Sequence, residues 1–214
     1  SDLIYYQMIP LFIDITGRHI VIFGGGDVAA RKAAYFSGRA AVNAVSRSFV
    51  PAFDRLDVNR IKADIGPASG TSVKTYLDGA FLVIAATSDP GINNDIGRIC
   101  RKSNILFNNA DGESGDVILP AIAAGKNFTI AVSTSGNSPA ASRFIREKIE
   151  ELFPALDEMI ALQSRLRDEL KKKEPEQAKR SAIITRVLHD PAVWAALAAK
   201  DPGVWDDIMA RYVQ

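Results

Sequence analysis

The sequence is poor in the residues that build disulfides and metal sites. It has a single cysteine, Cys100, and two histidines, His19 and His189, among 214 residues. One cysteine cannot form a disulfide within the chain, and neither histidine has another histidine, cysteine or carboxylate at metal-ligand spacing. We therefore expect no bound metal and a reducing, cytoplasmic location.

Charge imbalance and long apolar runs are also missing. The 26 lysines and arginines nearly balance the 25 aspartates and glutamates, so the formal net charge is +1. No overall field favours nucleic acid or an anionic membrane as a partner. The longest apolar runs, such as residues 80–86, are too short to cross a bilayer, and the sequence shows no targeting signal. We expect a compact protein with neither nucleic-acid nor membrane partners.

The first half of the chain alternates short apolar runs with helical patterns, which is typical of a parallel sheet with crossover helices. The run FLVIAA is continuously apolar, as expected of a central strand that is covered on both faces. This half therefore predicts an α/β fold with a Rossmann-type parallel sheet. Strands are predicted at 19–23, 41–45, 81–86 and 105–108, and helices at 28–36 and 90–102.

The pattern changes after Asp111. Residues 117–119 and 128–132 predict two further strands, and apolar spacing predicts a helix over 140–152. After Pro154 the pattern is wholly helical, with two Asp-Pro segments eleven residues apart that each predict a short helix. The second half thus predicts a small α+β region followed by a C-terminal helical domain.

A glycine-rich segment follows the first predicted strand and opens the first predicted helix. Residues 24–29 read GGGDVA and match the G-x-G-x-x-A form of the dinucleotide-binding fingerprint. Free amides at such a helix start can hold a pyrophosphate. The candidate phosphate-binding residues are Gly24, Gly25, Gly26, Asp27 and Val28.

The end of the second predicted strand lacks the acid that usually binds the adenosine ribose. Ser46, Arg47 and Ser48 stand there instead. An arginine with serines could accept the 2′-phosphate of NADP. Equally, Arg47 could stack on the adenine or lie in solvent. We include Arg47 and Ser48 among the candidate cofactor-binding residues.

Taken together, the motifs over residues 8–152 resemble the precorrin-2 dehydrogenases, the NAD-binding module of siroheme synthases. The matching blocks occur in the family's order, and Asn93 matches as well. The blocks are 9–15 (IPLFIDI), 24–32 (GGGDVAARK), 85–90 (AATSDP), 107–111 (FNNAD), 119–121 (LPA), 131–140 (AVSTSGNSPA) and 145–150 (IREKIE).

The resemblance implies a homodimer that oxidises precorrin-2 to sirohydrochlorin with NAD, in siroheme biosynthesis. Some family members also act as sirohydrochlorin ferrochelatases, with ferrous iron as substrate. The implied architecture has three parts: an NAD-binding domain over 1–113, a dimerisation region over 114–146 and a helical domain over 147–214.

The resemblance also places the family's catalytic aspartate on Asp111. It follows a predicted strand at the carboxyl edge of the sheet, where open α/β folds bind ligands. A carboxylate there could take the proton that leaves as a hydride passes to the nicotinamide. Gly112 follows, so the second acid often found next in the family is absent. By the same resemblance, we expect Thr87 beside the nucleotide.

A hydroxyl-rich loop and the helix after it are candidates for binding the carboxylates of the tetrapyrrole. The loop can offer hydroxyls and amides, and two arginines three residues apart on the helix could clamp acidic groups. The same residues are equally compatible with a capped helix whose charged side chains lie in solvent and bind nothing. The candidates are Ser133, Thr134, Ser135, Asn137, Arg143 and Arg146.

Two other functions are compatible with these motifs. A nucleotide- and tetrapyrrole-binding sensor that has lost catalysis would explain the missing second acid. An NADP-linked reductase of another substrate would explain Arg47.

Overall fold

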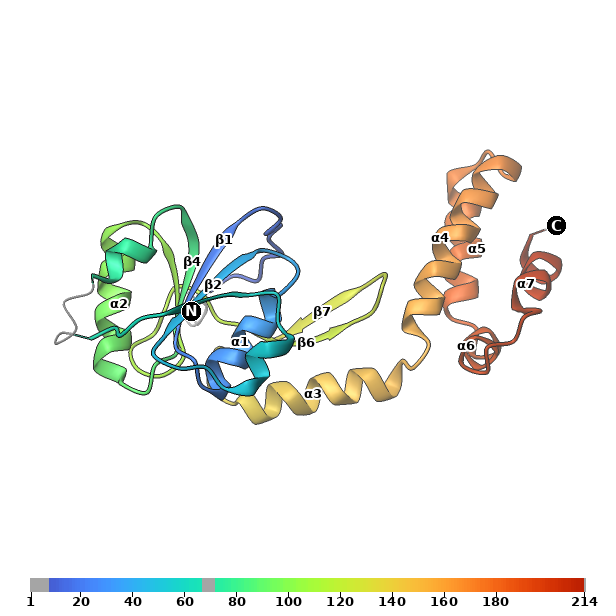
Figure 1. Ribbon diagram of the computed structural model, residues 1–214. Coiled ribbons are helices and arrows are strands. Elements are labelled where there is room, and N and C mark those ends of the chain that lie inside the picture. Colours follow the sequence, from blue (N-terminus) through green and yellow to red (C-terminus); the bar gives the residue numbers. More distant parts are fainter. Residues whose placement is uncertain (1–7, 67–71, 214) are drawn as a thin grey trace, which may run out of the picture. The chain divides into compact units, whose positions relative to one another are not determined.

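The computed structural model describes residues 8–66 and 72–213 (Figure 1). Contacts divide the chain into two compact units, Ser1–Leu119 and Pro120–Gln214. No helix within the described ranges combines the length and the apolar character needed to cross a membrane.

The first unit is built on a five-stranded parallel sheet with the order β3-β2-β1-β4-β5. Two α-helices and two short 3-10 helices connect the strands. The elements are β1 (His19–Phe23), α1 (Asp27–Phe36), β2 (Ala41–Ser46), η1 (Pro51–Arg55), β3 (Asn59–Lys62), η2 (Val73–Tyr76), β4 (Ala80–Ala85), α2 (Pro90–Lys102) and β5 (Leu106–Asn109).

The two helices cover opposite faces of the sheet because successive strand residues point to opposite sides. Ile20 and Ile22 of β1 pack with Ala29 of α1. The intervening Val21 packs with Ile96 of α2. The central strands are therefore buried on both faces, which explains their continuous apolar sequence.

The strands and helices predicted between residues 19 and 108 are confirmed, each with bounds within one residue of the observed ones. The edge strand β3 (Asn59–Lys62) was not predicted. Its sequence NRIK has one residue, Ile61, that is half-buried, while the others are exposed. An edge strand with so little burial carries no apolar pattern to detect.

The second unit contains an antiparallel pair of strands and five helices among its described residues. Strand β6 pairs with β7, and Met159, Leu162, Leu166 and Leu170 of α4 form the centre of the helical core. The elements are β6 (Ala121–Ala124), β7 (Thr129–Val132), α3 (Pro139–Leu152), α4 (Leu156–Lys173), α5 (Gln177–Leu188), α6 (Pro191–Ala198) and α7 (Val204–Tyr212).

The strand predicted at 117–119 is wrong, since the strand of this region is β6 (Ala121–Ala124). Val117 and Leu119 are apolar because they pack against the sheet of the first unit. The Val117 amide donates to the Phe107 carbonyl at 3.0 Å, and the Asn108 side chain donates to the Val117 carbonyl at 2.6 Å. The predicted strand at 128–132 and the helix at 140–152 are confirmed as β7 and α3.

Candidate functional site

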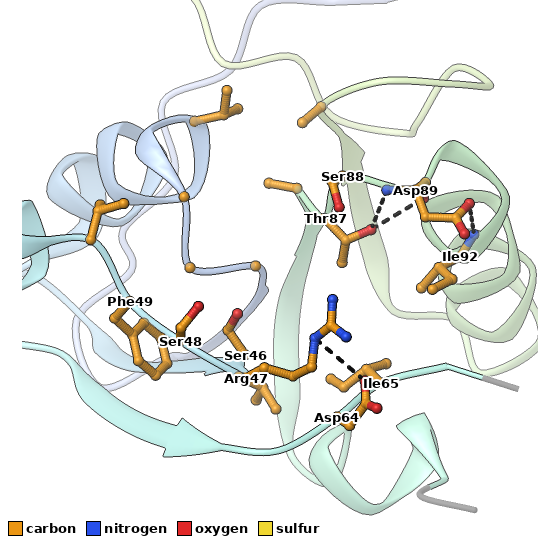
Figure 2. A pocket seen from close by; sticks show the side chains of 18 of the residues that line it. Ser46, Arg47, Ser48, Phe49, Asp64, Ile65, Thr87, Ser88, Asp89 and Ile92 are labelled. Carbon is orange, nitrogen blue, oxygen red and sulfur yellow. Dashed lines mark hydrogen bonds and ion pairs between the residues drawn. The ribbon is translucent and has the colours of Figure 1, made fainter. Parts of the chain in front are cut away.

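The loops after the five parallel strands line one pocket of about 880 Å³ in the first unit. It lies at the carboxyl edge of the sheet, where dinucleotide-binding folds place their ligand. Figure 2 shows the pocket between the glycine-rich loop and the start of α2. It brings together the predicted cofactor residues and Asp111: Gly24, Gly25, Gly26, Asp27, Val28, Arg47, Ser48, Thr87 and Asp111.

The three glycines of the loop are required for different reasons. Gly24 has a φ of +132°, and a Cβ there would lie 2.3 Å from the Ala86 carbonyl oxygen. A Cβ on Gly25 would lie 1.8 Å from the Ser48 carbonyl oxygen. A Cβ on Gly26, by contrast, would have no described atom within 4 Å beyond its chain neighbours. Packing within the protein thus requires glycine at positions 24 and 25. At position 26, glycine would be required only by a bound molecule.

The start of α1 faces the pocket without a side-chain cap. Gly26 is the N-cap residue with φ −85° and ψ −176°, and no side chain accepts a hydrogen bond from the first amides. Helix starts leave several amides without intrahelical acceptors, and these favour anions. The geometry suits the pyrophosphate of a dinucleotide.

Lys32 of α1 is partly buried and connects the helix to the last strand of the sheet. Its ammonium donates to Oδ1 of the buried Asn108 at 2.7 Å. Burial lowers the pKa of Lys32 below its ordinary value, and the nearby Arg31 lowers it further. Through Asn108, this contact also holds the segment at Val117 that leads out of the first unit.

At the end of β2, Arg47 extends its side chain into the pocket (Figure 2). Its Nε lies 3.8 Å from Oδ1 of Asp64, which follows β3 and also lines the pocket. Asp64 is a site residue that the sequence pattern did not reveal, because the edge strand before it was not predicted. The sequence offered one weak signal for it: Asp64 is an acidic residue that closely follows a short segment containing the apolar Ile61.

The loop after β4 is held by the side chain of Asn93, which is fully buried. Its Oδ1 accepts hydrogen bonds from the Thr87 amide at 3.1 Å and the Thr87 hydroxyl at 2.7 Å. Its Nδ2 donates to the carbonyl oxygens of Thr87 at 3.2 Å and Asp111 at 3.4 Å. Asn93 therefore connects the Thr87 loop with the Asp111 loop.

The carboxylate of Asp111 is exposed at the pocket, and within residues 8–66 and 72–213 it has no hydrogen-bond or ion-pair partner. Its amide donates to Asn109 Oδ1 at 3.2 Å, and the Glu113 amide donates to Asn94 Oδ1 at 2.9 Å. Gly112 has a φ of +128°, and a Cβ there would lie 2.5 Å from Asn94 Oδ1. A second acid at that position would strain the backbone and displace the Asn94 side chain from its contact with the Glu113 amide.

The candidates for binding carboxylates belong to the second unit, whereas the pocket is lined by the first unit alone. Ser133, Ser135 and Asn137 are exposed. The Thr134 hydroxyl donates to the Ser138 carbonyl at 3.0 Å and accepts from the Ser138 amide at 3.0 Å, so it stabilises the start of α3.

The two arginines of α3 differ in how they are engaged. The Arg146 guanidinium forms ion pairs at 2.9 Å with both Glu147 and Glu150. Arg143 is exposed and has no ion pair or hydrogen bond among the described residues. Of the two, Arg143 is thus the cation available to an acidic ligand.

The fold and the pocket define a dinucleotide-binding protein of the Rossmann type. Residues 11–121 match a family model described as "Putative NAD(P)-binding", and residues 128–152 match "Sirohaem biosynthesis protein central". The chain is 40% identical over 193 residues to a "Precorrin-2 dehydrogenase" of Methanosarcina barkeri, with 88% of this chain and 86% of that protein covered. It therefore belongs to the precorrin-2 dehydrogenase family, as the motifs indicated.

A longer relative agrees with this assignment, and a solved structure agrees with the fold. A "Siroheme synthase" of Nitrosospira multiformis is 30% identical over 199 residues, which cover 91% of this chain and 42% of that protein. A solved structure, "SirC, precorrin-2 dehydrogenase", has a TM-score of 0.71 at 20% identity and covers 95% of this chain and 100% of its own. At that identity the structure supports the fold alone.

Proposed function

We propose that this protein oxidises precorrin-2 to sirohydrochlorin with NAD as the acceptor. The observation that carries the proposal is one pocket that joins the glycine-rich loop to Asp111, in a chain 40% identical to a precorrin-2 dehydrogenase over most of its length. The residues fit the cofactor, because the open space beside Gly26 is what a pyrophosphate needs at this loop.

On this proposal, Gly24 to Val28 hold the pyrophosphate with the amides at the start of α1. Thr87 lies beside the nucleotide at the end of the neighbouring strand. When bound, the nicotinamide supplies the hydride acceptor of the oxidation. The protein's task is then to orient the substrate and to receive the proton that is lost with the hydride.

Asp111 is the group that we assign to proton transfer. Its carboxylate is exposed at the pocket and free of partners among the described residues, whereas its loop is fixed by Asn93 and Asn94. A base of this kind could take the proton or stabilise positive charge that develops in the macrocycle. Fixing the loop keeps the carboxylate in position without neutralising it.

The acidic side chains of the tetrapyrrole would be recognised by the Ser-rich loop and α3. Arg143 offers an unengaged cation, and Ser133, Ser135 and Asn137 offer exposed polar groups. Thr134 and Arg146 act on the structure of the loop and helix instead, since both are engaged within the unit.

The protein would act as a homodimer formed through residues of about 114–146. Within residues 8–66 and 72–213, strands β6 and β7 pair only with each other, so each has an edge whose backbone groups are unpaired there. On α3, Phe144 is 58% exposed and Ile145 is 42% exposed. A second copy could cover both the strand edge and this apolar surface.

Incubation with precorrin-2 and NAD tests the function directly. We expect NADH to form together with the absorption spectrum of sirohydrochlorin. Binding of both molecules without turnover would favour a sensor, and turnover with NADP alone would favour an NADP-linked enzyme. A parallel reaction with ferrous iron tests whether the protein also inserts this substrate metal to give siroheme.

A further inference from the structure

Arg47 and Asp64 meet in the part of the pocket that borders the glycine-rich loop. Figure 2 shows the Arg47 side chain reaching into the pocket with Asp64 beside it. We infer that Asp64 is the residue that selects NAD over NADP at this site. The inference deepens the proposed function, because it rests on NAD being the cofactor of the pocket.

The register of the sheet puts Asp64 where the missing ribose-binding acid should be. Strands β2 and β3 are parallel and pair Ser46 with Lys62, and the Ala63 amide donates to the Ser46 carbonyl at 3.0 Å. Asp64 comes next, and its Oδ1 lies 3.8 Å from Nε of Arg47. In dinucleotide-binding folds, the carboxyl end of the second strand borders the adenosine ribose. Here the neighbouring strand provides the acid.

The same end of β2 is packed directly against the glycine-rich loop. The Val50 amide donates to the Gly25 carbonyl at 2.9 Å, and the Gly24 amide donates to the Val45 carbonyl at 3.0 Å. A nucleotide whose pyrophosphate lies on this loop would thus bring its adenosine ribose toward Arg47 and Asp64.

The charges around this position disfavour an extra phosphate. The described residues that line the pocket include four aspartates, Asp27, Asp64, Asp89 and Asp111, and one arginine, Arg47. A carboxylate accepts a hydrogen bond from the ribose 2′-hydroxyl of NAD but repels the 2′-phosphate of NADP. Asp64 also offsets Arg47, the cation among the described lining residues that could attract that phosphate.

Asp64 can be changed without a large loss of stability. Its side chain is 57% exposed and that of Arg47 is 76% exposed. Ion pairs between exposed side chains contribute little to folding. A substitution at Asp64 should therefore alter nucleotide preference while the protein stays folded.

The test is a titration of the full chain with NADH and with NADPH, followed by nicotinamide fluorescence. We expect the parent to prefer NADH. Asp64→Asn should raise the affinity for NADPH relative to NADH by about tenfold, or about 1.4 kcal/mol, mainly because Arg47 loses the carboxylate that offsets its charge and can then attract the 2′-phosphate. Adding Arg47→Ser to Asp64→Asn should abolish most of this gain, because the freed arginine would supply it.

Asp54→Asn is the matched control. It removes the same charge from the same unit, but the Asp54 carboxylate pairs with Arg60 at 2.6 Å and does not line the pocket. A parent that prefers NADPH, or an Asp64→Asn shift no larger than that of Asp54→Asn, would overturn the inference. Binding needs no precorrin-2, so a clear Asp64→Asn shift without precorrin-2 oxidation would contradict only the proposed function. Precorrin-2 oxidation with an unchanged preference would contradict only the role of Asp64.

Discussion

The buried side chain of Asn93 donates a hydrogen bond to the main-chain carbonyl of Asp111 and, through its other contacts, holds Thr87. One residue of α2 thus fixes the loops that end two neighbouring strands, β4 and β5. We regard Asn93 as a positioning residue, since it lies behind the pocket and acts through the main chain of its neighbours.

Asn93→Asp should therefore lower kcat more than it weakens nucleotide binding. The aspartate keeps the oxygen that accepts from the Thr87 amide and hydroxyl, and it removes the NH₂ group that donates to the carbonyls of Asp111 and Thr87. We expect kcat to fall by about tenfold or more, because small misplacements of a catalytic group are costly, while the Kd for NADH stays within about threefold. Asn59→Asp makes the same change on the edge strand and should alter neither value. Equal losses in both parameters for Asn93→Asp would indicate a purely structural role.

The glycine-rich loop predicts opposite outcomes for two neighbouring substitutions. Gly26→Val has open space and an extended backbone, so the protein should fold with nearly the parent melting temperature and lose nucleotide binding. Gly25→Ala would place a Cβ against the Ser48 carbonyl and should cost about 1–3 kcal/mol or more of stability. Thermal unfolding and an NADH titration check both. A folded Gly26→Val protein that binds NADH normally would refute the pyrophosphate assignment.

The thiol of Cys100 should be protected in the folded protein. Cys100 is fully buried, and burial followed by the charge of Asp116 raises its pKa from 9.0 to about 11. A thiol reagent at mildly alkaline pH should label it only after unfolding in denaturant. Because the unfolded thiol ionises first, this group's contribution to stability should be lost as the pH rises from about 9 toward 11. Rapid labelling of the native protein would contradict this burial.

If the apolar surface of α3 forms the dimer contact, a single charge introduced there should separate the two copies of the protein. Phe144→Glu should convert a dimer into a monomer, because it would bury a carboxylate in the contact. Light scattering at micromolar concentration measures the result. Ala182→Glu adds the same charge at an exposed position of α5 and should remain dimeric. A monomeric parent protein would refute the proposed dimer.

The sequence predicted the parts of the fold that depend on burial. Strands such as β1 and β4 were predicted within one residue because both faces are covered and the sequence is continuously apolar. The edge strand β3 was missed because its residues are largely exposed. The sequence predicts a strand at 117–119 because Val117 and Leu119 are apolar, as the residues of a buried strand are. They are apolar here because they pack against the five-stranded sheet without joining it.

The candidate site was predictable only where local sequence determines it. The loop GGGDVA and Asp111 follow strands that were recognised, so the sequence alone could place them at one edge of the sheet. The position of Asp64 depends on the pairing of β2 with β3. The role of Asn93 depends on hydrogen bonds between loops far apart in sequence. Neither relationship produces a periodic pattern.

The central claim is that Asp111 takes part in the oxidation itself rather than in folding or nucleotide binding. The most direct measurement is the rate of NADH formation from precorrin-2 and NAD by Asp111→Ala, alongside an NADH titration of the same protein. We predict a rate at least about a hundredfold below the parent, the effect of losing a positioned base, with NADH affinity near the parent value. A rate within a few-fold of the parent, or a collapse of NADH binding together with the rate, would contradict this claim.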